Sequence, residues 1–147
     1  MDDLEFRLMN EAHINYGNFL CVLQRSTWRL QLAIEKGNIS NAPTILSDIV
    51  SDYVTLQEKY AKIDVARYDK EHGGLIMAEI KEKLPRIYPL IKDIESLLQN
   101  PERGSLQEKL QRLSEDFSAL SRLGGRFGQL PKYSQYRDER GRRSSTN

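Results

Sequence analysis

Cysteine is almost absent from this chain of 147 residues, which contains only Cys21. A single cysteine excludes a disulfide bond within the chain, and this favours an intracellular protein, either cytoplasmic or nuclear. The neighbours of Cys21 in the stretch NFLCVLQ are mostly apolar. We therefore expect a buried, unreactive thiol, because a reactive cysteine needs a positive and partly exposed setting.

Histidine is nearly as scarce, and its scarcity limits metal chemistry. Two histidines and one cysteine do not supply a zinc tetrad unless carboxylates are added. Asp69 and His72 have the spacing of one half of a di-iron site, but such a site needs a matching pair on a second helix. His13 has no matched acidic partner. We expect no metal site and no cofactor.

Long hydrophobic runs are also missing. The longest uninterrupted run covers five residues, 19–23, whereas a membrane-spanning helix needs about 20. The first residues, MDDLEFRLMNEAH, contain neither a basic start nor a long apolar stretch, so we expect no secretory signal. These features predict a soluble protein without a transmembrane segment.

Motifs of catalysis and phosphate binding are not found in the sequence. It has no GxSxG nucleophile motif, and its glycine pairs, Gly73-Gly74 and Gly124-Gly125, neither fit the P-loop pattern nor follow a predicted strand. Helix termination explains both pairs. A thin helical protein also has few deep pockets, so we expect that the protein is not an enzyme.

Apolar residues recur at helical spacing along most of the chain, and no segment shows the alternation of a strand. The pattern predicts helical segments at about 3–36, 42–70, 75–99 and 105–125. Gly37 is the expected stop of the first segment, and Asn41 is the expected N-cap of the second. Ser105 and Glu108 have the spacing of a capping box. The expected fold is all-α: an elongated helical bundle, or helical hairpins, with coiled-coil-like packing.

The second segment carries the clearest seven-residue repeat. Its two rows are Ala42, Ile49, Leu56 and Ile63, and Leu46, Tyr53 and Tyr60. This period is typical of helices that pair side by side. The third and fourth segments are expected to be shorter, and Pro85 and Pro89 predict a kink or break in the third. The uncovered part of the first two helices should therefore bind a partner, most simply a second copy.

The sequence thus predicts a non-enzymatic, self-associating interaction protein, such as an adaptor, a regulator or an assembly subunit, that binds itself and another protein. The expected interface residues are Ile49, Tyr53, Leu56, Tyr60 and Ile63. Trp28 and Tyr68, like Tyr53 and Tyr60, fall at core or core-edge positions of the repeat. For these aromatic residues we favour packing over a surface on which bases stack.

The chain divides by charge into a helical domain, 1–125, and a tail, 126–147. The domain has a net charge of −3, from sixteen basic residues (Lys and Arg) and nineteen acidic residues (Asp and Glu). The tail has a net charge of +4, from six basic and two acidic residues. The tail has few apolar residues, so we expect it to be flexible and disordered. An alternative function is therefore nucleic-acid binding through the tail. The expected contacts with DNA or RNA are Arg126, Lys132, Tyr133, Tyr136, Arg137, Arg140, Arg142 and Arg143.

Removal of residues 126–147 tests this alternative. If the tail binds nucleic acid, the truncation should abolish binding and leave helicity unchanged. The full-length affinity should fall steeply with salt, by a logarithmic slope of about −0.9 per phosphate contact on B-DNA. Fluorescence anisotropy with labelled DNA and RNA at several salt concentrations measures both effects. Binding that survives the truncation would place the site on the helical domain, near Arg25, Arg29 and Lys36.

Overall fold

The computed structural model describes residues 7, 10–11, 17–67, 73–99 and 103–129, and these residues form helices and short connections without a strand. The all-α prediction is confirmed. The α-helices are α2 (Gly17–Glu35), α3 (Ala42–Ala61), α4 (Gly74–Lys83), α5 (Tyr88–Gln99) and α6 (Arg103–Gly125). Short 3₁₀ helices connect or follow them: η2 (Ile39–Asn41), η3 (Val65–Arg67), η4 (Leu84–Ile87) and η5 (Arg126–Gln129).

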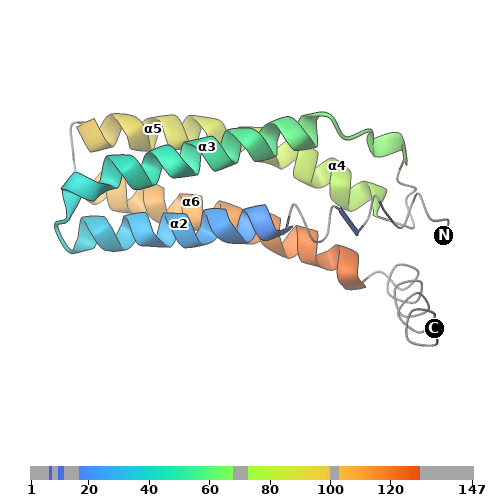
Figure 1. Cartoon of the computed structure of the whole chain (residues 1–147), viewed down its shortest axis with the longest axis horizontal. Helices are drawn as coiled ribbons and strands as arrows, with labels where there is room; N and C mark the ends of the chain where they lie inside the picture. Colours follow the sequence, from blue (N-terminus) through green and yellow to red (C-terminus); the bar gives the residue numbers. More distant parts are fainter. Residues whose placement is uncertain (1–6, 8–9, 12–16, 68–72, 100–102, 130–147) are drawn as a thin grey trace, which may run out of the picture.

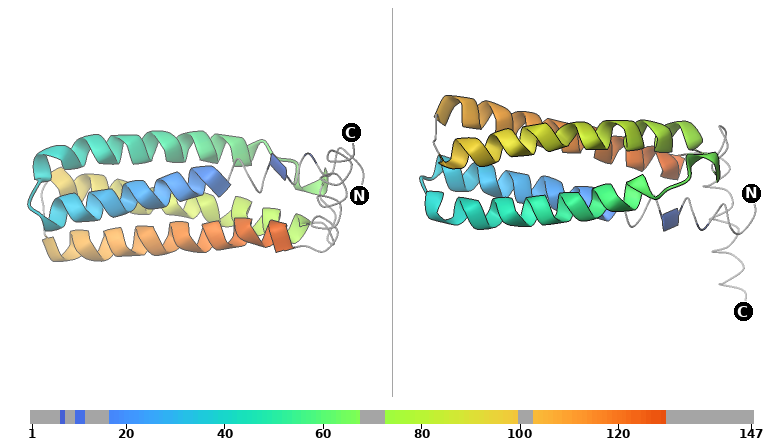
Figure 2. Two further views of the ribbon diagram at one scale, coloured as in Figure 1. Left: turned by 60° about the horizontal axis from the view of Figure 1, so that its bottom comes forward. Right: turned by 90° about the horizontal axis from the view of Figure 1, so that it is seen from above.

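The helices lie side by side as four rods in an elongated bundle (Figure 1). Three rods are α2, α3 and α6, and the fourth is the interrupted rod α4–η4–α5. Helix α2 packs against α3 and α6, while α6 also packs against α4 and α5, and α3 contacts α5. Successive rods run in opposite directions, which Figure 2 shows from two further sides. The bundle therefore closes on itself, and coiled-coil geometry within it stays a prediction.

Gly37 ends α2, as the sequence predicts. Its φ of 74° lies in the left-handed region, which glycine adopts without a steric penalty. The amide of Gly37 donates to the carbonyl of Ile34 at 3.1 Å, and the amide of Asn38 donates to the carbonyl of Ala33 at 2.8 Å. This pair of bonds is a Schellman motif. It satisfies two carbonyls at the helix end and turns the chain towards α3.

Helix α3 ends at Ala61, so the expected continuation to residue 70 is wrong. Asp64 Oδ1 accepts a hydrogen bond from the backbone amide of Ala66 at 3.0 Å, which starts a turn in place of another helical turn. Lys81 Nζ on α4 donates to the carbonyl of Ile63 at 2.8 Å and fixes that turn. The helix therefore ends at a local turn, although the apolar repeat continues to Ile63.

Other helix ends also differ from the sequence-based expectation. Asn41 is the N-cap of α3, but its side chain makes no capping hydrogen bond. Gly73, with a φ of 105°, precedes α4 and begins that helix, whereas the sequence suggested that it ends the second helix. Helix α6 begins at Arg103, so Ser105 lies inside the first turn and the expected capping box with Glu108 is wrong.

For α3 the expected length mismatch with the later helices is wrong as well. Helix α6 has 23 residues, whereas α3 has 20 and the described α2 has 19. The third rod extends from Gly74 to Gln99 because η4 carries the chain through the two prolines. The third and fourth rods therefore cover the apolar faces of α2 and α3.

Tyr53 stabilises the interruption of the third rod. Pro85 and Pro89 each lack an amide hydrogen, and here α4 gives way to the 3₁₀ helix η4. The buried hydroxyl of Tyr53 donates to the carbonyl of Leu84 at 2.6 Å. An unsatisfied carbonyl at this depth would cost about 1–3 kcal/mol. The phenol of α3 thus satisfies one carbonyl at the break and ties α3 to the third rod.

The core runs along the whole bundle, and each rod contributes to it. Its fully buried members include Leu23, Leu30, Ile49, Leu56, Met77, Ile80, Ile94, Leu110, Leu113 and Phe117. Leu110, Leu113 and Phe117 of α6 recur at intervals of three and four residues, the spacing of one helical face. In the described part of the chain, no helix is long and apolar enough to cross a membrane.

Replacement of Tyr53 by Phe tests the role of its hydroxyl. Burial raises the pKa of Tyr53 from its ordinary value of 10.0 to about 12. The folded state therefore favours the neutral form of the phenol. Its contribution to folding stability is fully present below pH 10 and is lost as the pH rises from 10 to about 12. Y53F should lower the unfolding free energy at pH 7 by about 1–3 kcal/mol.

The same variant should also weaken the pH dependence. Ionisation of the Tyr53 phenol above pH 10 lowers the stability of the wild type, because the buried phenol resists ionisation in the folded state, and Y53F lacks this loss. Urea unfolding at pH 7, 10 and 11 measures both effects. Tyr88→Phe is the matched control, because Tyr88 is substantially exposed. Equal alkaline losses in the wild type and Y53F would contradict the assignment.

Candidate interaction surface

The seam predicted as an interface lies inside the chain. Ile49, Tyr53, Leu56 and Tyr60 are buried, and Ile63 is partly buried against the same core. The neighbouring helices of the same chain cover these side chains, so a partner does not reach the first four while the bundle is closed. The seven-residue repeat marks a buried helix face, but it does not say whether that face meets the same chain or another.

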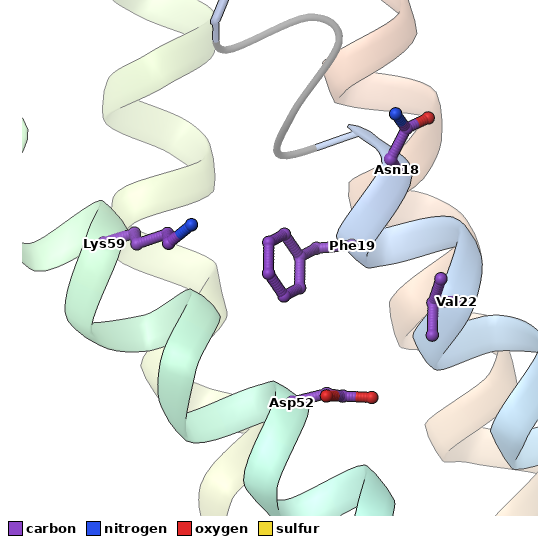
Figure 3. A pocket seen from close by; sticks show the side chains of 5 residues that line it. All are labelled: Asn18, Phe19, Val22, Asp52 and Lys59. Carbon is purple, nitrogen blue, oxygen red and sulfur yellow. The ribbon is translucent and has the colours of Figure 1, made fainter.

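A groove between α2 and α3 has a partly apolar lining. Asn18, Phe19 and Val22 line it from α2, and Asp52 and Lys59 line it from α3, around a volume of about 410 Å³. Figure 3 shows the Phe19 ring between the two helices, with the Lys59 side chain directed towards it. We call this hollow the α2–α3 groove. Its mixed lining suits a partner with both apolar and charged side chains.

The antiparallel pairing of α2 with α3 builds the groove. Phe19 and Val22 are three residues apart, so both lie on the side of α2 next to α3. Lys59 Nζ lies 4.7 Å from the centroid of the Phe19 ring, within the range of a cation–π interaction. Phe19 is partly buried against the core, whereas Val22 is 44% exposed. The groove therefore extends the core to the surface.

Sequence reasoning missed the groove for a definite reason. Phe19 and Val22 both lie in the apolar run 19–23, whose side chains a helix distributes over different sides. A run of this kind is a signal that one of its apolar side chains is exposed. The pairing of Val22 with Asp52 and Lys59, thirty or more positions later, depends on the hairpin and has no local signal.

Two further hollows on the described surface are lined mostly by charged and polar residues. One, of about 690 Å³ between α2 and α6, is lined by Gln31, Glu35, Gln107, Glu108, Gln111, Arg112, Glu115 and Asp116. The other, of about 300 Å³ between η4 and α6, is lined by Lys83, Arg86, Ile87, Arg112, Asp116, Ala119 and Leu120. The described residues contain no cluster of three potential metal ligands.

Charged groups in α4 and η4, near one of these hollows, form pairs four residues apart in the chain. Lys83 Nζ lies 2.7 Å from Glu79, and Arg86 lies 2.7 Å from Glu82. The hydrogen bond from Lys83 lowers the pKa of the Glu79 carboxyl. Burial raises the pKa of Asp116, although the nearby charge of Arg112 acts in the opposite direction. Exposed pairs four residues apart typically support a helix and do not by themselves indicate a reactive site.

Cys21 is exposed, so the expectation of a buried thiol is wrong. Trp28, for which we expected packing at a core or core-edge position, is exposed as well. Trp28 is 59% exposed. It lies on the side of α2 next to α6, because Gln24 and Gln31 flank it at four and three residues and bond to Ser118 and Gln111 of α6. The expected burial of Tyr53 and Tyr60 is confirmed.

Several sequence-based expectations concern residues outside the described part of the chain. Arg126 is exposed at the start of η5. The other predicted nucleic-acid contacts lie outside the described residues: Lys132, Tyr133, Tyr136, Arg137, Arg140, Arg142 and Arg143. His13, Tyr68, Asp69 and His72 lie outside them too. Nucleic-acid binding through the tail therefore stays a prediction.

Comparison with known proteins adds no functional assignment. No family model matches the chain, and no curated protein and no solved structure matches it significantly. The assignment of a function consequently depends on the surface of the bundle itself.

The exposure of Trp28 and Cys21 can be measured in solution. Trp28 is the single tryptophan, so its emission reports one site. Acrylamide should quench this emission in the native protein nearly as well as in urea, because the indole is mostly in contact with solvent. Cys21 should likewise react with Ellman's reagent without unfolding. A blue-shifted, poorly quenched emission together with a slow thiol reaction would contradict this placement.

Proposed function

We propose that the protein is a non-enzymatic, self-associating helical interaction protein that serves as an adaptor, a regulator or an assembly subunit. The observation that supports this proposal is the α2–α3 groove, where Phe19 and Val22 present apolar surface between charged side chains. Aromatic side chains and partly exposed apolar residues at the centre of a charged surface are common features of binding interfaces.

The proposal differs in one respect from the interface that the seven-residue repeat suggests. The buried face of α3 is occupied by the same chain, so a contact through Ile49 or Leu56 would require the bundle to open. Opening would expose the core, which costs about 25 cal/mol for each Å² of apolar surface. A contact through the groove avoids this cost, because Val22 is already exposed.

The lining of the described hollows supports a role without catalysis. None of the three hollows described above is lined by a serine, threonine, cysteine or histidine. Their carboxylates and cations belong to wide, solvated surfaces. Such surfaces suit recognition by charge better than the desolvated chemistry of an active site.

Light scattering after gel filtration tests self-association. The wild type at micromolar concentration should have at least twice the chain mass of 17.0 kDa. Val22→Glu should shift the protein towards the monomer, because a carboxylate would be desolvated in the contact. Trp28→Glu is the matched control, since it alters an exposed apolar residue on another side of α2. A wild-type mass of one chain at all accessible concentrations would refute the proposal.

A further inference from the structure

The two helices that border the α2–α3 groove carry opposite charges along their central part. Arg25 and Arg29 follow Val22 on α2 by three and seven residues, so they continue the same face. Asp48 precedes the groove residue Asp52 on α3 by four residues and continues its face in the same way. This surface of the bundle therefore has a basic edge on α2 and an acidic edge on α3.

These four charged groups are available to a partner. Arg25, Arg29 and Asp48 are exposed, and Asp52 is partly exposed. The ion pairs of the described residues involve α4, η4, α5 and α6, and none of them includes a residue of α2 or α3. The charges consequently face solvent without an ion-pair partner in the described part of the chain.

The contact between Phe19 and Lys59 sets the relative heights of these charges. Both helices rise by 1.5 Å per residue and run in opposite directions. Arg25 lies six residues after Phe19 on α2, and position 53 lies six residues before Lys59 on α3. Arg25 is therefore level with position 53, which is next to Asp52. Ten residues in each direction bring Arg29 level with position 49, next to Asp48. Each arginine is therefore nearly level with one aspartate.

We propose that a second copy of this chain docks on this face, about a two-fold axis that runs along the groove, parallel to the helices. This arrangement rests on the proposed self-association and specifies its geometry. A rotation about such an axis keeps every residue at its own height and places α2 of one copy over α3 of the other. Arg25 then meets Asp52 of the second copy, and Arg29 meets Asp48 of the second copy, twice each.

The apolar residues fit the same arrangement. The two grooves face each other along the axis, so Phe19 and Val22 of both copies come together at its centre. The ion pairs lie on either side of the axis, as the polar rim does in an ordinary interface. The same surface patch serves in both copies, as an isologous contact requires.

The charges also select against the other simple two-fold arrangement. An axis perpendicular to the helices, in the plane of the contact, would place α2 over α2 and α3 over α3. Arginines would then face arginines, and aspartates would face aspartates, which is unfavourable. Lys59 lies further along α3, beyond the acidic edge. In the proposed arrangement it faces the start of α2, where Gly17 and Asn18 carry no charge.

Mixing two charge-reversed variants tests the arrangement. Arg25→Glu alone places two carboxylates opposite each other at both contacts, and Asp52→Arg alone places two cations there. Each variant should dimerise at least about tenfold more weakly than the wild type. An equimolar mixture should form a heterodimer of nearly wild-type affinity, since both contacts then join opposite charges. A charge effect within one chain is not rescued by mixing.

The variants Arg29→Glu and Asp48→Lys repeat the mixing test at the second ion pair. This second test is needed because Asp52 is partly buried, and Asp52→Arg could unfold the chain. Arg86→Glu is the control, because this arginine is exposed on another rod. Rescue by mixing, measured by analytical ultracentrifugation, supports the two-fold arrangement. A wild-type dimer that all four reversals leave unchanged would overturn the arrangement and leave self-association intact. A monomeric wild type would refute both.

Discussion

The hydrogen bond from the Tyr53 hydroxyl to the Leu84 carbonyl is the constraint on which the bundle depends. Two prolines interrupt the third rod, and the interruption removes regular helical hydrogen bonds at the centre of the molecule. Because a phenol from α3 reaches this site, the break is accommodated within the core. The rod then continues to Gln99, and α6 returns to pack against α2, α4 and α5.

Closure of the bundle decides which surfaces are available for binding. The apolar faces of α2 and α3 are covered by the third and fourth rods, so the strongest repeat of the sequence becomes the interior. The surface retains a smaller apolar site, the α2–α3 groove, where Phe19 extends the core outward and Lys59 covers its ring. The proposed self-association and its charge pairing both depend on this groove and on the edges beside it.

Several helix ends and exposures depend on competition that the apolar pattern does not record. The hydrogen bond of Asp64 to the amide of Ala66 stops α3 although apolar residues continue beyond it. Cys21 lies among apolar neighbours and is nevertheless exposed, since a helix directs successive side chains to different sides. Trp28 is exposed beside two glutamines that bond to α6. Hydrogen bonding and helix geometry therefore decide these features, and hydrophobicity alone does not.

The sequence by itself determined the all-α fold, the helical periods, the stop at Gly37 and the interruption at the prolines. These features follow from backbone sterics and from residues close together in the chain. Only the tertiary structure decided that Ile49, Tyr53, Leu56 and Tyr60 are interior, and that Phe19 and Asp52 border one groove. The physical reason is that a periodic pattern defines an apolar face, whereas the neighbour that covers this face comes from residues far along the chain.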